Sequence, residues 1–102
     1  MARQCVGKVS ELEPGCIERV EVDGVAYCLA HLEDGGIFAI DDRCTHEDES
    51  LSDGELSGDH VECPAHGSRF SVKTGDVTGM PATIPTKTYS VVVEGDQIFL
   101  DV

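Results

Sequence analysis

The sequence predicts an all-β fold in which short antiparallel strands form a sandwich or a barrel. Apolar runs are short, turn signals recur about every ten residues, and no stretch shows helical periodicity. Closely spaced turn signals between short strands are typical of β-sandwiches and β-barrels. The chain has 102 residues, which is room for one domain. We therefore expect a single domain over residues 1–102.

The expected strands follow from alternation and from the turns between them. Residues 16–22 read CIERVEV and alternate between apolar and polar side chains, as a half-buried strand does. Asp23-Gly24 is then a strong hairpin signal. Gly95-Asp96 predicts a second hairpin near the end of the chain. The strands expected in chain order are residues 5–9, 16–22, 25–31, 37–40, 89–94 and 97–102.

Residues 41–59 differ from the rest of the chain because they are polar, acidic and rich in turn residues. A structureless loop of this length is uncommon inside a compact domain and is usually functional or disordered. We expect this segment to be a long loop that is either functional or disordered.

The composition excludes several classes of partner. The formal net charge is −13, with 20 acidic and 7 basic residues, so neither nucleic acid nor an anionic membrane is an expected partner. No segment has the length of a membrane span, and residues 1–10 contain no apolar signal region. We expect a soluble cytoplasmic monomer. The acidity either guides it to a more basic partner or simply keeps it soluble.

Two short motifs predict a metal centre. Cys44-Thr45-His46 and Cys63-Pro64-Ala65-His66-Gly67 each offer a thiolate and an imidazole within a tight turn, with sixteen residues between His46 and Cys63. In a reducing compartment, such residues indicate metal ligands before disulfides. A [2Fe-2S] cluster needs two protein ligands on each iron, so the two cysteines would bind one iron and the two histidines the other. Two ferric ions, two sulfides and two thiolates make a formally neutral oxidised site, which accepts an electron more readily than a four-thiolate site. The alternative is a structural zinc site, although zinc spacings more often pair Cys with Cys and His with His.

These motifs resemble the Rieske iron–sulfur family, and the resemblance extends over the whole chain. Arg69-Phe70 and Thr74-Gly75 fit Rieske ferredoxins, and Gly79-Met80-Pro81 looks like the proline loop that covers the cluster. The resemblance implies an antiparallel sandwich of stacked small sheets, with two cluster-binding loops at one tip. It also implies that Gly67, Ser68 and Pro81 surround the ligands. The Ser68 hydroxyl would donate to a cluster sulfide and raise the reduction potential, whereas nearby acidic residues would lower it.

The resemblance is to one branch of the family. Respiratory Rieske proteins have an extra cysteine in each cluster loop, where this chain has Glu49 and Ala65. The chain looks instead like the ferredoxin component of the bacterial ring-hydroxylating dioxygenases of aromatic hydrocarbon catabolism. That resemblance implies a one-electron carrier between a flavin reductase and a terminal oxygenase, docking transiently at the cluster tip, and not an enzyme. The alternative is a cluster-bearing small subunit of another oxidoreductase, similar to that of nitrite reductase.

Six further residues lie outside the two ligand motifs. His31 and His60 are expected to be surface histidines near turns. Cys5, Cys16 and Cys28 are expected to pack as small hydrophobic residues in strands. For Arg69, a local pairing with a cluster-loop carboxylate and simple solvation both remain open.

Overall fold

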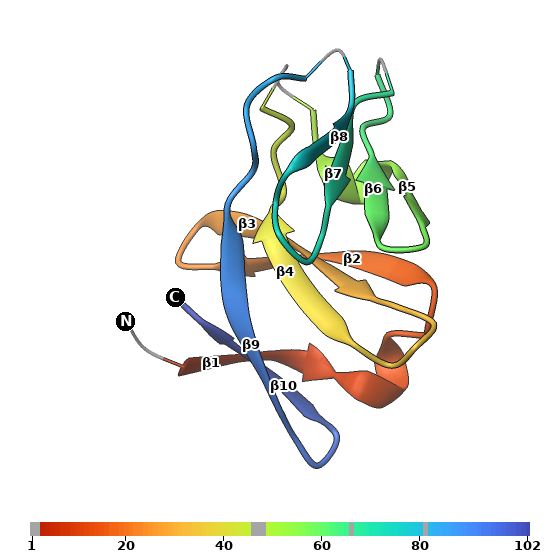
Figure 1. Cartoon of the computed structure of the whole chain (residues 1–102). Coiled ribbons are helices and arrows are strands. Elements are labelled where there is room, and N and C mark those ends of the chain that lie inside the picture. The colour runs from red at the N-terminus through yellow and green to blue at the C-terminus, as the bar shows by residue number, and fades with distance from the viewer. Residues whose placement is uncertain (1–2, 46–48, 66, 81) are drawn as a thin grey trace.

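The computed structural model describes residues 3–45, 49–65, 67–80 and 82–102. These residues form ten strands and two single-turn 3-10 helices, Val9–Glu11 and Leu51–Asp53. Figure 1 shows the strands: β1 (Arg3–Lys8), β2 (Cys16–Val22), β3 (Val25–His31), β4 (Ile37–Asp41), β5 (Glu55–Ser57), β6 (His60–Glu62), β7 (Arg69–Ser71), β8 (Val77–Gly79), β9 (Thr88–Glu94) and β10 (Gln97–Asp101). None of the described helices has the length and apolar character needed to span a membrane.

The larger sheet contains all six strands that the sequence predicts. Its order is β1-β10-β9-β4-β3-β2, and its neighbouring strands pair antiparallel. The predicted antiparallel all-β fold is therefore confirmed. The β2–β3 hairpin turns at Asp23 and Gly24, whose φ angles are 51° and 81°. Two consecutive positive φ angles are what a type I′ hairpin turn requires.

The smaller sheet consists of short strands in the order β5-β6-β7-β8, and Figure 1 places it at one end of the larger sheet. The expectation of a long loop over residues 41–59 was wrong for its second half, because this part contains the helix Leu51–Asp53 and strand β5. Strands β6, β7 and β8 were not predicted from the sequence either. Each of the four strands has three residues, which is too few for an alternating pattern to become visible.

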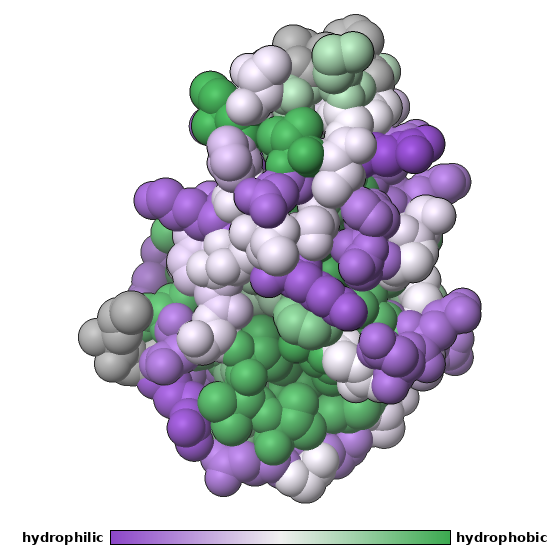
Figure 2. Space-filling view, in the orientation of Figure 1, coloured by the Kyte–Doolittle hydropathy of each residue, from purple (hydrophilic) through white to green (hydrophobic). Residues whose placement is uncertain are grey.

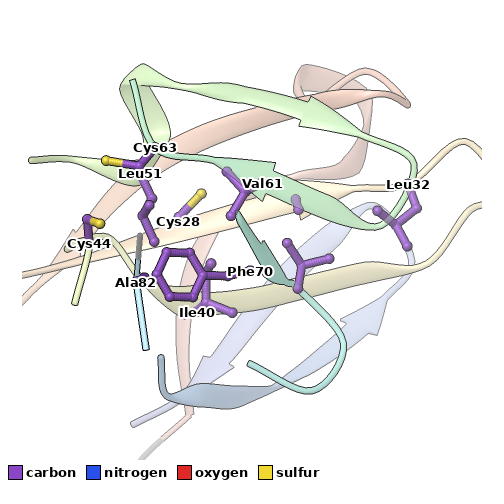
Figure 3. Close-up of a cluster of buried hydrophobic side chains, with 11 residues drawn as sticks. Cys28, Leu32, Ile40, Cys44, Leu51, Val61, Cys63, Phe70 and Ala82 are labelled. Atoms are coloured by element: carbon purple, nitrogen blue, oxygen red, sulfur yellow. The ribbon is translucent and has the colours of Figure 1, made fainter. Parts of the chain in front are cut away.

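Strands β3 and β4 separate two hydrophobic cores. Along β3, Cys28 and Ala30 face a core shared with the smaller sheet, whereas Tyr27 and Leu29 face a core within the larger sheet. Successive side chains of a strand point to opposite faces, so β3 is buried on both sides. Figure 3 shows the first core, in which Phe70 of β7 packs near Ile40 of β4. This core fixes the smaller sheet on the larger one.

Candidate metal centre

The first cluster motif lies in a hairpin-like loop that leaves the end of β4. Arg43 and Ser50 form an isolated antiparallel bridge, and the Cys44 N–H donates to the Glu49 carbonyl at 2.9 Å. The two sides of the loop therefore remain paired up to Cys44. Residues 46–48 lie outside the described residues, and with them the predicted ligand His46.

The second motif forms a tight turn between β6 and β7. The Cys63 N–H donates to the Ser68 carbonyl at 2.7 Å, and the Gly67 N–H donates to the Cys63 carbonyl at 3.2 Å. Gly67 has φ +79°, a conformation that favours glycine because it has no Cβ. The turn therefore depends on the glycine of the motif. The fourth predicted ligand, His66, lies outside the described residues.

The fold brings the two cysteines of the motifs into one core. Cys44 is 2% exposed and Cys63 is 1% exposed, and both belong to the core shared by the two sheets. In Figure 3 they lie toward the same end of that core, near Leu51. Gly54 allows the two loops to approach, because a Cβ at this position would collide with the Glu62 carbonyl just before Cys63. No group of three metal-ligating side chains occurs among the described residues, which do not include His46 and His66.

A third segment is hydrogen-bonded to both loops. The Thr45 hydroxyl donates to the Ile84 carbonyl at 2.6 Å, and the Ala82 N–H donates to the Ser68 hydroxyl oxygen at 3.0 Å. Ser68 is 1% exposed. These bonds hold the segment after β8 against the two motifs, where the sequence predicts a covering loop. Pro81 lies outside the described residues, so its predicted role stays a prediction.

The described residues fit a thiolate-bound cluster. Two buried cysteines from separate turns belong to one apolar core. Burial beside hydrophobic residues protects an iron–sulfur centre from water and influences its potential. Because Ser68 accepts the Ala82 N–H through its oxygen, its own hydroxyl proton stays available to another acceptor.

The residues outside the motifs only partly follow the predictions. The expectation that His31 lies at the surface was wrong: it is 6% exposed, and its Nδ1 lies 2.6 Å from the Leu12 carbonyl, to which it donates. His60 is half-buried, as the end of a short strand would be. Cys28 is fully buried as predicted, but Cys5 and Cys16 are exposed, because each occupies a strand position that faces solvent.

Of the two alternatives for Arg69, local pairing with a carboxylate or simple solvation, the structure shows the pairing, with Glu62. The Arg69 Nε lies 3.0 Å from Glu62 Oε1, and both side chains are about half exposed. Glu62 directly precedes Cys63, so the pair joins β7 to β6 beside the second motif. An ion pair this exposed is worth at most about 1 kcal/mol.

Comparison with known proteins identifies the family. Residues 2–90 match the model of the Rieske [2Fe-2S] domain. The chain belongs to the Rieske [2Fe-2S] family. Its cofactor is therefore one Rieske-type [2Fe-2S] cluster, and the structural-zinc alternative is not supported. The buried Cys44 and Cys63 are consistent with the thiolate half of such a site.

Several relatives resemble this Rieske chain over almost its full length. It is 42% identical to the 3-phenylpropionate/cinnamic acid dioxygenase ferredoxin subunit of Photorhabdus laumondii, with 100% of this chain and 96% of the relative covered. The solved ferredoxin of carbazole 1,9a-dioxygenase from Nocardioides aromaticivorans IC177 superposes with a TM-score of 0.92 at 31% identity, covering 98% and 97% of the two chains.

Two further solved structures bear on function and on fold. A chain in a complex of reduced oxygenase and oxidized ferredoxin in carbazole 1,9a-dioxygenase superposes with a TM-score of 0.91 at 35% identity, covering 96% of this chain and 91% of that one. A putative nitrite reductase small subunit superposes with a TM-score of 0.83 at 22% identity, covering 100% of both chains. At that identity, the second likeness concerns the fold alone.

Proposed function

We propose that this Rieske chain is the ferredoxin component of a ring-hydroxylating dioxygenase system and carries one electron at a time from a flavin reductase to a terminal oxygenase. The observation that carries the proposal is the full-length similarity to dioxygenase ferredoxins, combined with two buried cysteines that converge from separate loops. The chain acts as a single domain over residues 1–102, as a monomer in the cytoplasm.

Four residues hold the cluster in this proposal. Cys44 and Cys63 would hold one iron, and His46 and His66 would hold the other. When bound, the cluster supplies a reversible one-electron acceptor. The protein contributes the paired loop around Cys44 and the glycine-dependent turn after Cys63, which keep the two thiolates together and away from water.

The remaining histidines argue against an oxygenase reaction in this chain. A mononuclear iron site of that class commonly needs two histidines and a carboxylate with open positions. His31, the last residue of β3, is buried and donates to the Leu12 carbonyl. His60 lies in the smaller sheet and contacts Asp59 and Thr78. The two histidines that are not cluster ligands therefore have separate structural partners, and the chain is an electron carrier.

The surface near the motifs supports docking at this end. Met80 is 83% exposed and Ile84 is 61% exposed; Ile84 belongs to the segment that is bonded to the two loops, and Met80 lies just before it. Figure 2 shows hydrophobic atoms near this end on an otherwise largely hydrophilic upper half. Electron transfer requires close approach, and transient redox interfaces are small, below about 1,200 Å². Met80 and Ile84 would provide the apolar contact.

Spectroscopy of purified variants tests the cluster and its ligands. Dithionite-reduced wild type is expected to give the rhombic EPR signal with a low average g value of a histidine-ligated cluster. C44S, H46A, C63S and H66A should each abolish this signal. The controls C16S and H60A, which change the same residue types outside the motifs, should retain it. A colourless, EPR-silent wild type that contains zinc would overturn the proposal.

A further inference from the structure

One buried acidic residue, Asp42, makes hydrogen bonds at the base of the first cluster loop. The Asp42 carbonyl accepts from the Leu51 N–H at 2.8 Å, and its carboxylate Oδ1 accepts from the Ser52 N–H at 2.8 Å. Its own N–H is 3.4 Å from the Ala26 carbonyl of β3. Asp42 therefore closes the base of the loop that contains Cys44 and attaches this base to the larger sheet.

The Asp42 carboxylate is buried beside a basic group from another strand. Its side chain is 3% exposed, and Arg19 Nε of β2 lies 3.3 Å from Oδ2. Oδ2 has no aligned hydrogen bond among the described residues, so the contact with Arg19 is an ion pair rather than a good hydrogen bond. Arg19 is half exposed and also contacts Glu21 at 2.7 Å. A buried carboxylate with a half-exposed counter-charge is only partly neutralised.

The neighbouring thiol of Cys28 responds to this charge. Burial, and second to it the charge of Asp42, raises the pKa of Cys28 to about 12. Cys28 belongs to the same core as Cys44 and Cys63. Asp42 itself lies two residues before Cys44 along the chain, so its carboxylate belongs to the base of the same loop.

We propose that Asp42 and Arg19 form a positioning and charge pair for the cluster, in which Asp42 fixes the first loop and its partly balanced charge lowers the reduction potential. The proposal rests on the function proposed above and goes beyond it, because neither residue is a ligand. Adding an electron adds negative charge, which a nearby carboxylate disfavours and a nearby guanidinium favours. Removing the charge of Asp42 should therefore raise the reduction potential, and removing the charge of Arg19 should lower it.

Voltammetry of charge variants tests the electrostatic part. D42N keeps an oxygen that can accept the Ser52 N–H, and its potential should rise. R19Q should lower the potential by a smaller amount, and this shift should shrink at high salt because Arg19 is half exposed. The double variant should lie between the two. R3Q is the matched control: it removes the same charge from an exposed pair with Glu94 on the β1–β10 side, and it should leave the potential unchanged.

Thermal loss of the visible absorbance tests the positioning part. D42A removes the acceptor for the Ser52 N–H and should lose its cluster several-fold faster than wild type, whereas D42N should stay close to wild type. Equal potentials in D42N, R19Q and R3Q, or shifts of D42N and R19Q in the same direction, would overturn the electrostatic part. Equal rates of cluster loss in D42A and D42N would overturn the positioning part. If wild type itself gave no histidine-ligated EPR signal, the proposed function would fail instead.

Discussion

At the scale of single residues, Ser68 has two hydrogen-bonding tasks. Its oxygen accepts the buried Ala82 N–H at 3.0 Å, and its proton remains for a second acceptor, which the family resemblance predicts to be a cluster sulfide. S68A should lower the reduction potential and destabilise the protein by about 1–3 kcal/mol, because it leaves the Ala82 N–H without a partner. Voltammetry and chemical unfolding measure the two effects. S68T, which keeps the hydroxyl, is the control, and an unchanged potential in S68A would contradict the sulfide bond.

The five cysteines should differ in reactivity toward thiol reagents. Cys5 and Cys16 are exposed, whereas Cys28, Cys44 and Cys63 are buried. The thiolate is the reactive form, and the pKa of Cys28 is raised to about 12 by burial and Asp42. At pH 8 the folded, cluster-loaded protein should therefore react only at Cys5 and Cys16. Counting modified thiols by mass spectrometry tests this, with C5S and C16S each removing one modification. Labelling of Cys28 in the folded protein would contradict the prediction.

At the scale of elements, the β9–β10 turn carries a pH-dependent contact. Asp96 accepts hydrogen bonds from the Ser10 hydroxyl at 2.6 Å and from the Ser10 N–H at 2.9 Å, and these bonds lower the pKa of Asp96 below 3.8. A lowered folded-state pKa means that the contact stabilises the protein fully at neutral pH. This contribution begins to fall as the pH approaches 3.8 and is lost as the pH drops through the lower folded-state pKa.

The variant D96N keeps an acceptor in the turn but cannot titrate. Wild type should therefore be more stable than D96N at neutral pH, and the difference should narrow as the pH falls toward and below 3.8. Urea unfolding of both proteins at a series of pH values measures this difference, and effects common to both proteins cancel. A difference that stays constant or widens in acid would show that the Asp96 carboxylate makes no pH-dependent contribution.

Elements also differ in how far the sequence predicts them. The β2–β3 hairpin was predicted because its alternating strand has seven residues and Asp23-Gly24 favours the required turn. The smaller sheet was missed because three-residue strands carry no visible period. The ligand motifs are local in sequence and were predictable, whereas Asp42 resembles every other acid in an acidic segment. The proposed role of Asp42 depends on its contacts with Arg19 and Ser52, which form only in the folded chain.

At the scale of the whole molecule, the net charge of −13 dominates. A charge of this size keeps copies of the chain apart and attracts basic partners over distances comparable to the Debye length, about 8 Å at physiological ionic strength. The apolar side chains of Met80 and Ile84 are also exposed, next to the segment that is hydrogen-bonded to the two cluster loops. Long-range attraction and short-range apolar contact thus act at successive stages of docking, and the first stage depends on salt whereas the second does not.

Electron transfer to simple acceptors separates these two stages. The reduced protein should transfer its electron to basic cytochrome c at a rate that falls steeply as salt is added, because added ions screen the attraction. With ferricyanide, an anion, the rate should instead rise with salt, because repulsion is screened. Stopped-flow absorbance measures both rates.

The variant M80Q tests the apolar contact. It should slow electron transfer to a protein acceptor equally at low and high salt, without altering the slope of the rate against salt concentration. If the electron-transfer rates to both acceptors did not change with salt concentration, the acidic residues would serve solubility and not the guidance of partners.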